Sequence, residues 1–127
     1  MNKPHIKLFL VDDDSVFLKS LEIDFKANTD FDIVTFTSGE DCVKSLSMHP
    51  SIVILDYHLD GIIPNAMNGL QTLDMIKAFN AATPVIILSS QDKIEVAVNC
   101  MHHQAFDYVV KSETAFTRLQ RNISNIL

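Results

Sequence analysis

The sequence predicts one α/β domain, a doubly wound three-layer sandwich in which helices cover both faces of a five-stranded parallel sheet. Two observations predict this architecture. Five short β-rich runs recur along the chain, and a pattern typical of an amphipathic helix follows each of them. The 127 residues include only three glycines and no repeat or linker that would divide them, and this length is typical of one domain.

The first part of the chain contains two predicted strands, at residues 6–11 and 31–36, and the helix between them. Leu18, Leu21 and Phe25 fall at helical spacing and form the apolar stripe of this helix. Asp14 or Ser15 would cap its first turn, because a short polar side chain can accept a hydrogen bond from the exposed N–H groups there.

The second helix is predicted to begin at Ser38. Asp41 follows three residues later in the pattern of a capping box, with Asp in place of Glu. Pro50 cannot continue a helix and precedes the third strand, at residues 52–55. This strand is apolar throughout, as expected for a central parallel strand that is buried on both faces.

The rest of the chain adds strands at residues 85–88 and 106–110 and three further helices. The helices are predicted from apolar residues at helical spacing. Their stripes consist of Leu70, Leu73, Ile76 and Phe79 in the third helix, Ile94, Ala97, Val98 and Met101 in the fourth, and Phe116, Leu119, Ile123 and Leu127 in the fifth.

Composition argues against several classes of function. Ten basic and sixteen acidic residues give a formal charge of −6, which opposes binding to nucleic acid. No apolar run approaches the roughly 20 residues that span a bilayer, and no signal-peptide pattern is present, so we expect a cytoplasmic protein. Cys42 and Cys100 are expected to be reduced thiols. The adjacent His102 and His103 would point in different directions on a helix, so they would make a poor zinc site.

Polar side chains follow four of the predicted strands at the point where each strand ends. The carboxyl ends of parallel strands meet at one edge of the sheet. In the flavodoxin-like strand order 2-1-3-4-5, the first and third strands are also neighbours there. Singly, each residue could be a cap or a turn residue; together they predict a site. The residues are Asp12, Asp13, Asp14, Asp56, Ser89, Ser90 and Lys111.

This cluster is typical of phosphoryl transfer to an aspartate. Two acidic residues beside Asp56 leave excess negative charge after Lys111 is counted, and a divalent cation would balance it. Oxygen ligands favour Mg²⁺ over zinc. Metal and lysine would neutralise charge on the transferred group, the Ser89 hydroxyl would donate a hydrogen bond to it, and the aspartate would attack in line.

Four segments, at 8–14 (LFLVDDD), 52–56 (IVILD), 84–90 (PVIILSS) and 107–111 (DYVVK), resemble the receiver domain of two-component response regulators. The resemblance covers essentially the whole chain. It implies that Asp56 is the phosphoacceptor and that Asp12 and Asp13 hold Mg²⁺, which Mn²⁺ can replace. Asp13 would bind the metal directly, Asp12 largely through water, and His58 would add its backbone carbonyl.

The resemblance also implies a switch. Ser89 and Lys111 match the residues that bind the phosphoryl group, and Tyr108 matches an aromatic whose inward rotamer reports phosphorylation. A phosphoryl group adds negative charge and hydrogen-bond acceptors, so it would draw Ser89 toward Asp56 and leave room for Tyr108 to turn inward. The surface of the fourth helix, fifth strand and fifth helix would then change. The alternative for Tyr108 is a plain packed aromatic.

The implied partner is a histidine kinase or a histidine phosphotransfer protein, and phosphorylation-dependent homodimerisation is a further expectation. We expect residues 1–127 to form a receiver domain without an output domain, leaving the downstream effector unknown, and without turnover as an enzyme. Two alternatives stay open: a receiver-like interaction module that needs no phosphorylation, and an aspartyl-phosphate phosphohydrolase. The second is disfavoured, because His58 stands where its acidic general acid is required.

Three departures from the family pattern are apparent. The loop at 57–68 is several residues longer and carries the apolar Ile62, Ile63 and Met67, so that it either modulates access to the acceptor or is a tolerated surface insertion. Ser112 replaces the proline after Lys111, which leaves the peptide bond between them cis or trans. Gln104 replaces a glycine after the fourth helix, where a left-handed backbone favours glycine.

Overall fold

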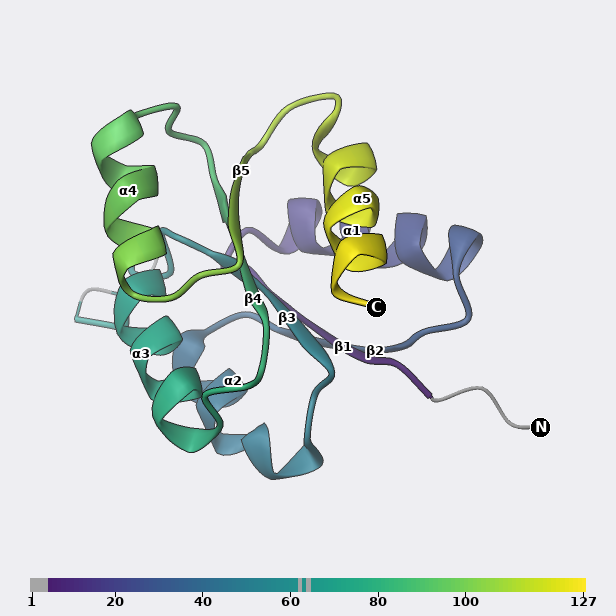
Figure 1. Ribbon diagram of the computed structural model, residues 1–127, viewed down its shortest axis with the longest axis horizontal. Coiled ribbons are helices and arrows are strands. Elements are labelled where there is room, and N and C mark those ends of the chain that lie inside the picture. Colours follow the sequence, from purple (N-terminus) through teal and green to yellow (C-terminus); the bar gives the residue numbers. More distant parts are fainter. Residues whose placement is uncertain (1–4, 62, 64) are drawn as a thin grey trace.

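The computed structural model describes residues 5–61, 63 and 65–127 and confirms the predicted fold (Figure 1). Strands and helices alternate along the chain, and the predicted strand limits are correct to within one residue. The strands are β1 (Lys7–Val11), β2 (Asp32–Phe36), β3 (Ile52–Asp56), β4 (Val85–Ser89) and β5 (Asp107–Val110). The helices are α1 (Ser15–Asn28), α2 (Gly39–Lys44), α3 (Gly69–Phe79), α4 (Ile94–His102) and α5 (Ala115–Ile126), with a short 3₁₀ turn, η1 (Leu46–Met48), after α2.

The five strands form one parallel sheet in the order β2-β1-β3-β4-β5. Strand order reverses at β1, so β1 and β3 are neighbours although a whole βα unit separates them in the sequence. Their register pairs Val11 with Leu55. The residues that follow these two, Asp12 and Asp56, therefore lie side by side at the carboxyl edge of the sheet.

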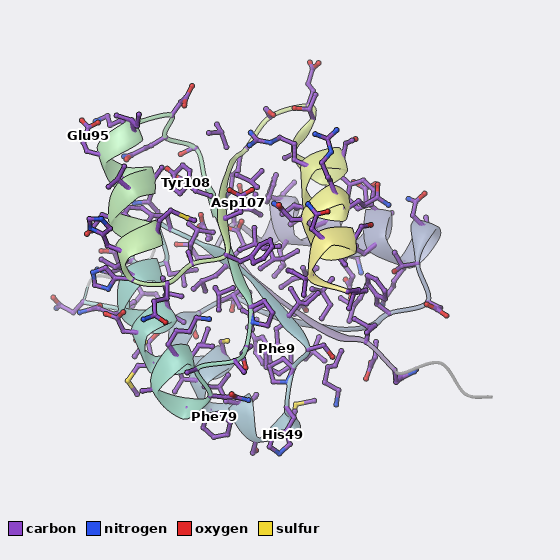
Figure 2. The ribbon with its side chains drawn as sticks, viewed as in Figure 1. Phe9, His49, Phe79, Glu95, Asp107 and Tyr108 are labelled. Atoms are coloured by element: carbon purple, nitrogen blue, oxygen red, sulfur yellow. The ribbon has the colours of Figure 1, made fainter. Side chains whose placement is uncertain are left out.

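Two apolar cores flank the sheet, because successive side chains of each strand point to opposite faces. One core, around Phe9 and Val53, lies against α2, α3 and α4. The other, around Leu10 and Ile54, lies against α1 and α5. Figure 1 shows the same division of the helices between the two faces. In Figure 2, Phe9 lies in the interior, whereas Phe79 lies at the end of α3, where its side chain is exposed.

Local hydrogen bonds explain where the helices begin. The Asp14 carboxylate accepts from the backbone N–H groups of Val16 and Phe17 and caps α1, as predicted. Ser38 caps α2 by accepting from Asp41 N, which is half of the expected capping box. A capping box with both bonds joins Asn68 and Gln71 at the start of α3.

The predicted inward face of α4 is wrong except at Ala97, which packs against the core. Ile94, Val98 and Met101 are exposed, and Val96 and Cys100 pack against the core instead. Two apolar stripes share this helix, so helical spacing alone selected the wrong one.

The structure answers two questions about the backbone: the isomer of the bond between Lys111 and Ser112, and the conformation of Gln104. No peptide bond within the described residues is cis, so the bond between Lys111 and Ser112 is trans. Gln104 has φ 72°, so the left-handed conformation is kept without glycine. In the described ranges, 5–61, 63 and 65–127, no helix combines the length and the hydropathy needed to cross a bilayer.

Candidate functional site

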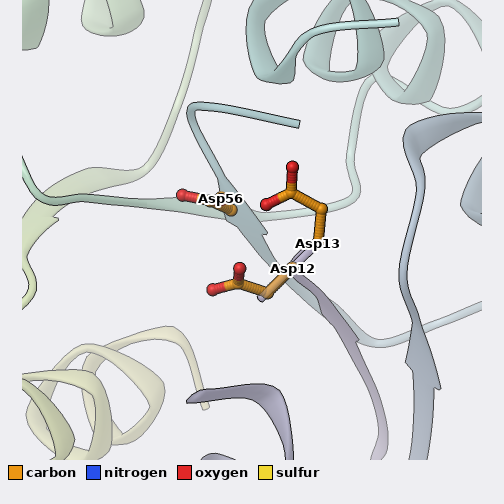
Figure 3. Close-up of side chains that lie close together, drawn as sticks. All are labelled: Asp12, Asp13 and Asp56. Carbon is orange, nitrogen blue, oxygen red and sulfur yellow. The ribbon is translucent and has the colours of Figure 1, made fainter. Parts of the chain in front are cut away.

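Three carboxylates meet at the carboxyl edge of the sheet (Figure 3). Asp12 and Asp13 directly follow β1, and Asp56 is the last residue of β3. Carboxylate oxygens of the three residues lie within 4.8 Å of one another. Asp12 and Asp56 are buried, with 1% and 3% of their surfaces exposed, whereas Asp13 is partly open to solvent. The strand register thus brings together the acidic residues that the sequence analysis selected.

Lys111, which follows β5, reaches across the edge of the sheet to the two buried carboxylates. Its Nζ lies 2.9 Å from Asp12 Oδ2 and 3.4 Å from Asp56 Oδ1. Asp12 Oδ1 accepts from Asp14 N at 2.9 Å, so both oxygens of Asp12 face a positive or N–H group. The ammonium compensates part of the negative charge buried here, and ion pairs of this kind are expensive to break by removal of one partner.

The acidic surroundings change the proton affinity of Asp56. Burial, and after it the charge of Asp12, raises the pKa of this carboxyl to about 7, although Lys111 and a backbone hydrogen bond from His58 act in the opposite direction. The pKa of Lys111 is raised, because attraction to Asp12 and Asp56 outweighs the opposing effect of burial. Negative charge is therefore in excess at Asp56 in the absence of a cation.

The donor set fits Mg²⁺. Asp13 Oδ2 is buried and has no hydrogen-bond partner among the described residues, which is costly unless a ligand satisfies it. The three carboxylates supply only oxygen donors at mutual distances that a single ion can bridge, and hard cations prefer such donors. His58 also borders this space, as the expected backbone ligand requires.

An open cavity of about 480 Å³ leads to Asp56 and is large enough for a phosphoryl group with its metal. Sequence analysis predicted part of its lining. It did not predict that Ser15, the first residue of α1, and Gly61, in the loop after β3, also face the cavity. The lining consists of Asp13, Asp14, Ser15, Asp56, His58, Gly61, Ser90 and Lys111.

Ser89 and Tyr108 lie beside the cavity and not in its lining. Ser89 is fully buried, and its Oγ accepts from Gln91 N at 3.0 Å. The Tyr108 hydroxyl donates to the Gln91 carbonyl oxygen at 2.6 Å, and only 8% of the residue is exposed. Figure 2 shows Tyr108 between β5 and α4. Its ring is therefore turned inward, and burial raises the pKa of its phenol.

The long loop at 57–68 borders the cavity through His58 and Gly61. Leu59 is buried in the core that lies against α2, α3 and α4, and Glu40 of α2 accepts from Met67 N at 2.8 Å, which ties the far end of the loop to α2. Between them, a β-carbon at Gly61 would lie 3.5 Å from Asp13 Oδ2. Of the apolar residues singled out in the sequence, Ile63 is exposed and Met67 half-buried; Ile62 lies outside the described residues.

Sequence analysis also missed an aromatic neighbour of the site. The Phe17 ring lies below the Lys111 ammonium, with 4.5 Å between Nζ and the ring centroid. The signal was present, because a cap at Asp14 places Phe17 in the first turn of a helix that starts at the carboxyl end of β1.

Comparisons with known proteins show which family the chain is similar to. The family model of the response regulator receiver domain matches residues 8–123. A protein-glutamate methylesterase/protein-glutamine glutaminase of Clostridium acetobutylicum is 31% identical over 116 residues, which cover 87% of this chain and 32% of the relative. The DNA-binding transcriptional regulator NtrC of Escherichia coli K12 is 30% identical over 122 residues, 93% of this chain and 25% of the relative. The chain thus spans about a third or less of the length of these relatives.

A solved structure is also similar. A chain in the crystal structure of the CheX–CheY–BeF3–Mg²⁺ complex from Borrelia burgdorferi superimposes with a TM-score of 0.80 at 26% sequence identity. The match covers 96% of this chain and 90% of that chain.

Proposed function

The chain belongs to the family of response regulator receiver domains of two-component systems, and we propose that it is a phosphoacceptor switch whose acceptor is Asp56. The observation that carries the proposal is the burial of Asp56 beside Asp12 and Asp13, with the Lys111 ammonium 3.4 Å from its carboxylate. We propose that the described chain acts as one receiver module, with residues 1–127 as its extent.

Phosphoryl transfer from a partner's phosphohistidine is the proposed reaction. An oxygen of Asp56 forms a bond to phosphorus as the phosphorus–nitrogen bond of the donor breaks, and the electron pair stays on the imidazole nitrogen. Lys111 balances charge on the transferred oxygens from one side. The high pKa of Asp56 means that the carboxylate must lose a competing proton before it attacks.

Asp12, Asp13, Asp56 and the His58 backbone carbonyl are the proposed ligands of Mg²⁺, for which Mn²⁺ can substitute. Mg²⁺ supplies positive charge to the phosphoryl oxygens when it is bound. Oδ2 of Asp12 and Oδ2 of Asp13 both lack a hydrogen bond among the described residues, but no ion pair engages Asp13 there, which supports direct coordination by Asp13. Asp12 is already paired with Lys111 and Asp14 N, which supports a more indirect role for it.

Ser89 and Tyr108 are the proposed switch. Ser89 Oγ has to leave Gln91 N to reach a phosphoryl group on Asp56, and the Tyr108 hydroxyl is bonded to the carbonyl of the same Gln91. The Tyr108 ring is already turned inward in this structure, so the proposed switch is a shift of the loop that holds Tyr108 when Ser89 moves. The affected surface comprises α4, β5 and α5, where Ile94, Val98 and Met101 are exposed.

The proposed donor is a histidine kinase or histidine phosphotransfer protein, and the proposed compartment is the cytoplasm. Homodimerisation through the α4–β5–α5 surface is a further proposal. Sedimentation with and without a phosphoryl mimic tests it, and an unchanged mass would count against it. We propose that the domain turns over no substrate beyond its own phosphoryl group, because His58 stands two residues after Asp56, where a phosphohydrolase needs an acid.

Intact-protein mass spectrometry after incubation with Mg²⁺ and acetyl phosphate tests the proposed function. The expected result is a gain of one phosphoryl group that is absent with EDTA. No gain with a competent donor would favour the alternative, an interaction module that works without phosphorylation.

A further inference from the structure

The Phe17 ring is a neighbour of Lys111 that the proposed reaction does not use. Phe17 lies in the first turn of α1, where Asp14 Oδ1 accepts from its backbone N–H at 3.2 Å. Its half-buried side chain packs against the core that lies between α1, α5 and the sheet. The position of this ring is thus fixed by both backbone and packing.

Lys111 has a fixed backbone but a long, flexible side chain. Its N–H donates to the Ser89 carbonyl oxygen at 2.7 Å and continues the pairing of β5 with β4. The chain then leaves the sheet at the exposed Ser112, so the backbone restrains only the start of the side chain. Four methylene groups separate this anchor from the ammonium, and such a side chain has many rotamers.

Three groups surround the ammonium. Asp12 Oδ2 and Asp56 Oδ1 lie at 2.9 and 3.4 Å, and the Phe17 ring centroid lies at 4.5 Å. The face of an aromatic ring is negative, and a cation within about 6 Å of its centroid is attracted to it. Only 18% of the Lys111 side chain is exposed, so the attraction is weakly screened.

We propose that Phe17 is a positioning residue, whose ring holds the Lys111 ammonium between Asp12 and Asp56 through a cation–π contact. This inference rests on the proposed function, because the consequence of positioning is that the charge of Lys111 is in place when a phosphoryl group arrives. The ring itself touches neither the acceptor nor the transferred group.

Fluorination of Phe17 is the sharpest test, because fluorine withdraws charge from the ring face while the ring keeps nearly the same shape. Trifluoro- and pentafluorophenylalanine are introduced at position 17, and the rate of phosphorylation by acetyl phosphate is measured at saturating Mg²⁺. The expected rate falls stepwise, to a loss of about three- to tenfold with five fluorines. Phe17→Tyr keeps the ring and should stay within about twofold of the native rate.

Phe31→Leu is the matched control. Phe31 is also half-buried against the same core, but it precedes β2 at the opposite edge of the sheet. Phe31→Leu and Phe17→Leu both lose an aromatic ring from this core, and only Phe17→Leu should slow phosphorylation. A rate that is equal across the fluorinated proteins would overturn the proposal, even if Phe17→Leu is slow, because bulk would then explain the effect.

A second readout does not depend on phosphorylation. Nuclear magnetic resonance order parameters of the Lys111 side chain report how firmly its end is held, and Lys77 provides the reference because its Nζ donates to the Thr83 carbonyl oxygen at 2.6 Å, away from the site. Pentafluorophenylalanine at position 17 should lower the order parameter of Lys111 alone. If the native protein accepts no phosphate, the proposed function fails, and this measurement still decides the inference: an unchanged Lys111 would refute it.

Discussion

Lys111 lies closer to Asp12 than to Asp56, the proposed acceptor, with its Nζ 2.9 Å from the one carboxylate and 3.4 Å from the other. This single ammonium therefore serves two buried acids from adjacent strand ends. It compensates charge when the site is empty and is within reach of a group attached to Asp56. Lys111 thus connects the stability of the site to its chemistry.

Lys111→Met should lower both the stability of the protein and the rate of its phosphorylation. The variant leaves Asp12 and Asp56 without this partner, so urea unfolding without Mg²⁺ should give a free energy of unfolding lower by about 1–3 kcal/mol. Phosphorylation by acetyl phosphate should slow roughly 100-fold, because a charge aimed at the reacting group is lost. Lys77→Met is the control, since Lys77 lies away from the site, and it should keep the native rate. Equal rates in the two variants would exclude Lys111 from the reaction.

Stability without metal should depend on pH through Asp56. Its pKa is raised from about 4 in the unfolded chain to about 7 in the folded protein, so folding favours its protonated form. The stability that protonated Asp56 contributes is fully present below about pH 4 and is lost as pH rises through about 7. Urea unfolding in EDTA should therefore show a falling free energy of unfolding over this range.

Asp56→Asn should remove this part of the pH dependence, because an amide does not ionise. Its melting temperature at pH 8 should exceed that of the native protein by about 5 °C, as expected for a gain of roughly 1 kcal/mol or more. Parallel pH profiles for the two proteins would show that Asp56 titrates normally.

Binding of Mg²⁺ should release a proton near neutral pH. Metal binding requires the Asp56 carboxylate, which is mostly protonated below its pKa of about 7. Calorimetric affinity should fall roughly tenfold from pH 8 to pH 6, and the measured heat should vary with the ionisation enthalpy of the buffer. Any residual binding by Asp56→Asn should lack this dependence. An affinity that is constant over this range in the native protein would contradict the proposed ligand role of Asp56.

Gly69→Ala should disturb the backbone that carries Asp56. A β-carbon at Gly69 would collide with the Asp56 carbonyl oxygen and lie 2.6 Å from that of Tyr57, so the backbone around Asp56 must shift. We expect a loss of roughly 2 kcal/mol or more in unfolding free energy and weaker Mg²⁺ binding. Gly61→Ala is the matched control, since its nearest contact would be an ordinary 3.5 Å to Asp13. Similar losses in both variants would argue against this explanation.

The sequence was sufficient for the sheet and for the residues at its edge. Apolar runs gave the strands, and the polar residues directly after them are Asp12, Asp56, Ser89 and Lys111. Parallel pairing alone then brings these strand ends together, because register fixes which residues are neighbours.

Two kinds of feature could not be predicted in this way: the rotation of a helix about its axis, and the direction in which a side chain at the sheet edge points. The fourth helix carries two apolar stripes, and only packing shows that Val96 and Cys100 face the core while Ile94 and Val98 do not. Likewise, Ser89 is buried behind the cavity while Ser90 lines it. Strand alternation places neighbouring residues on opposite sides, but it does not show which side opens to solvent.

Asp56, and neither Asp12 nor Asp13, is the proposed acceptor of the phosphoryl group. Borohydride reduction converts an aspartyl phosphate to homoserine, which tandem mass spectrometry assigns to one position after phosphorylation with Mg²⁺ and acetyl phosphate. We expect homoserine at position 56 alone, and none after incubation with EDTA. Homoserine at position 12 or 13, or none at all while a known receiver in the same reaction is labelled, would contradict the proposal.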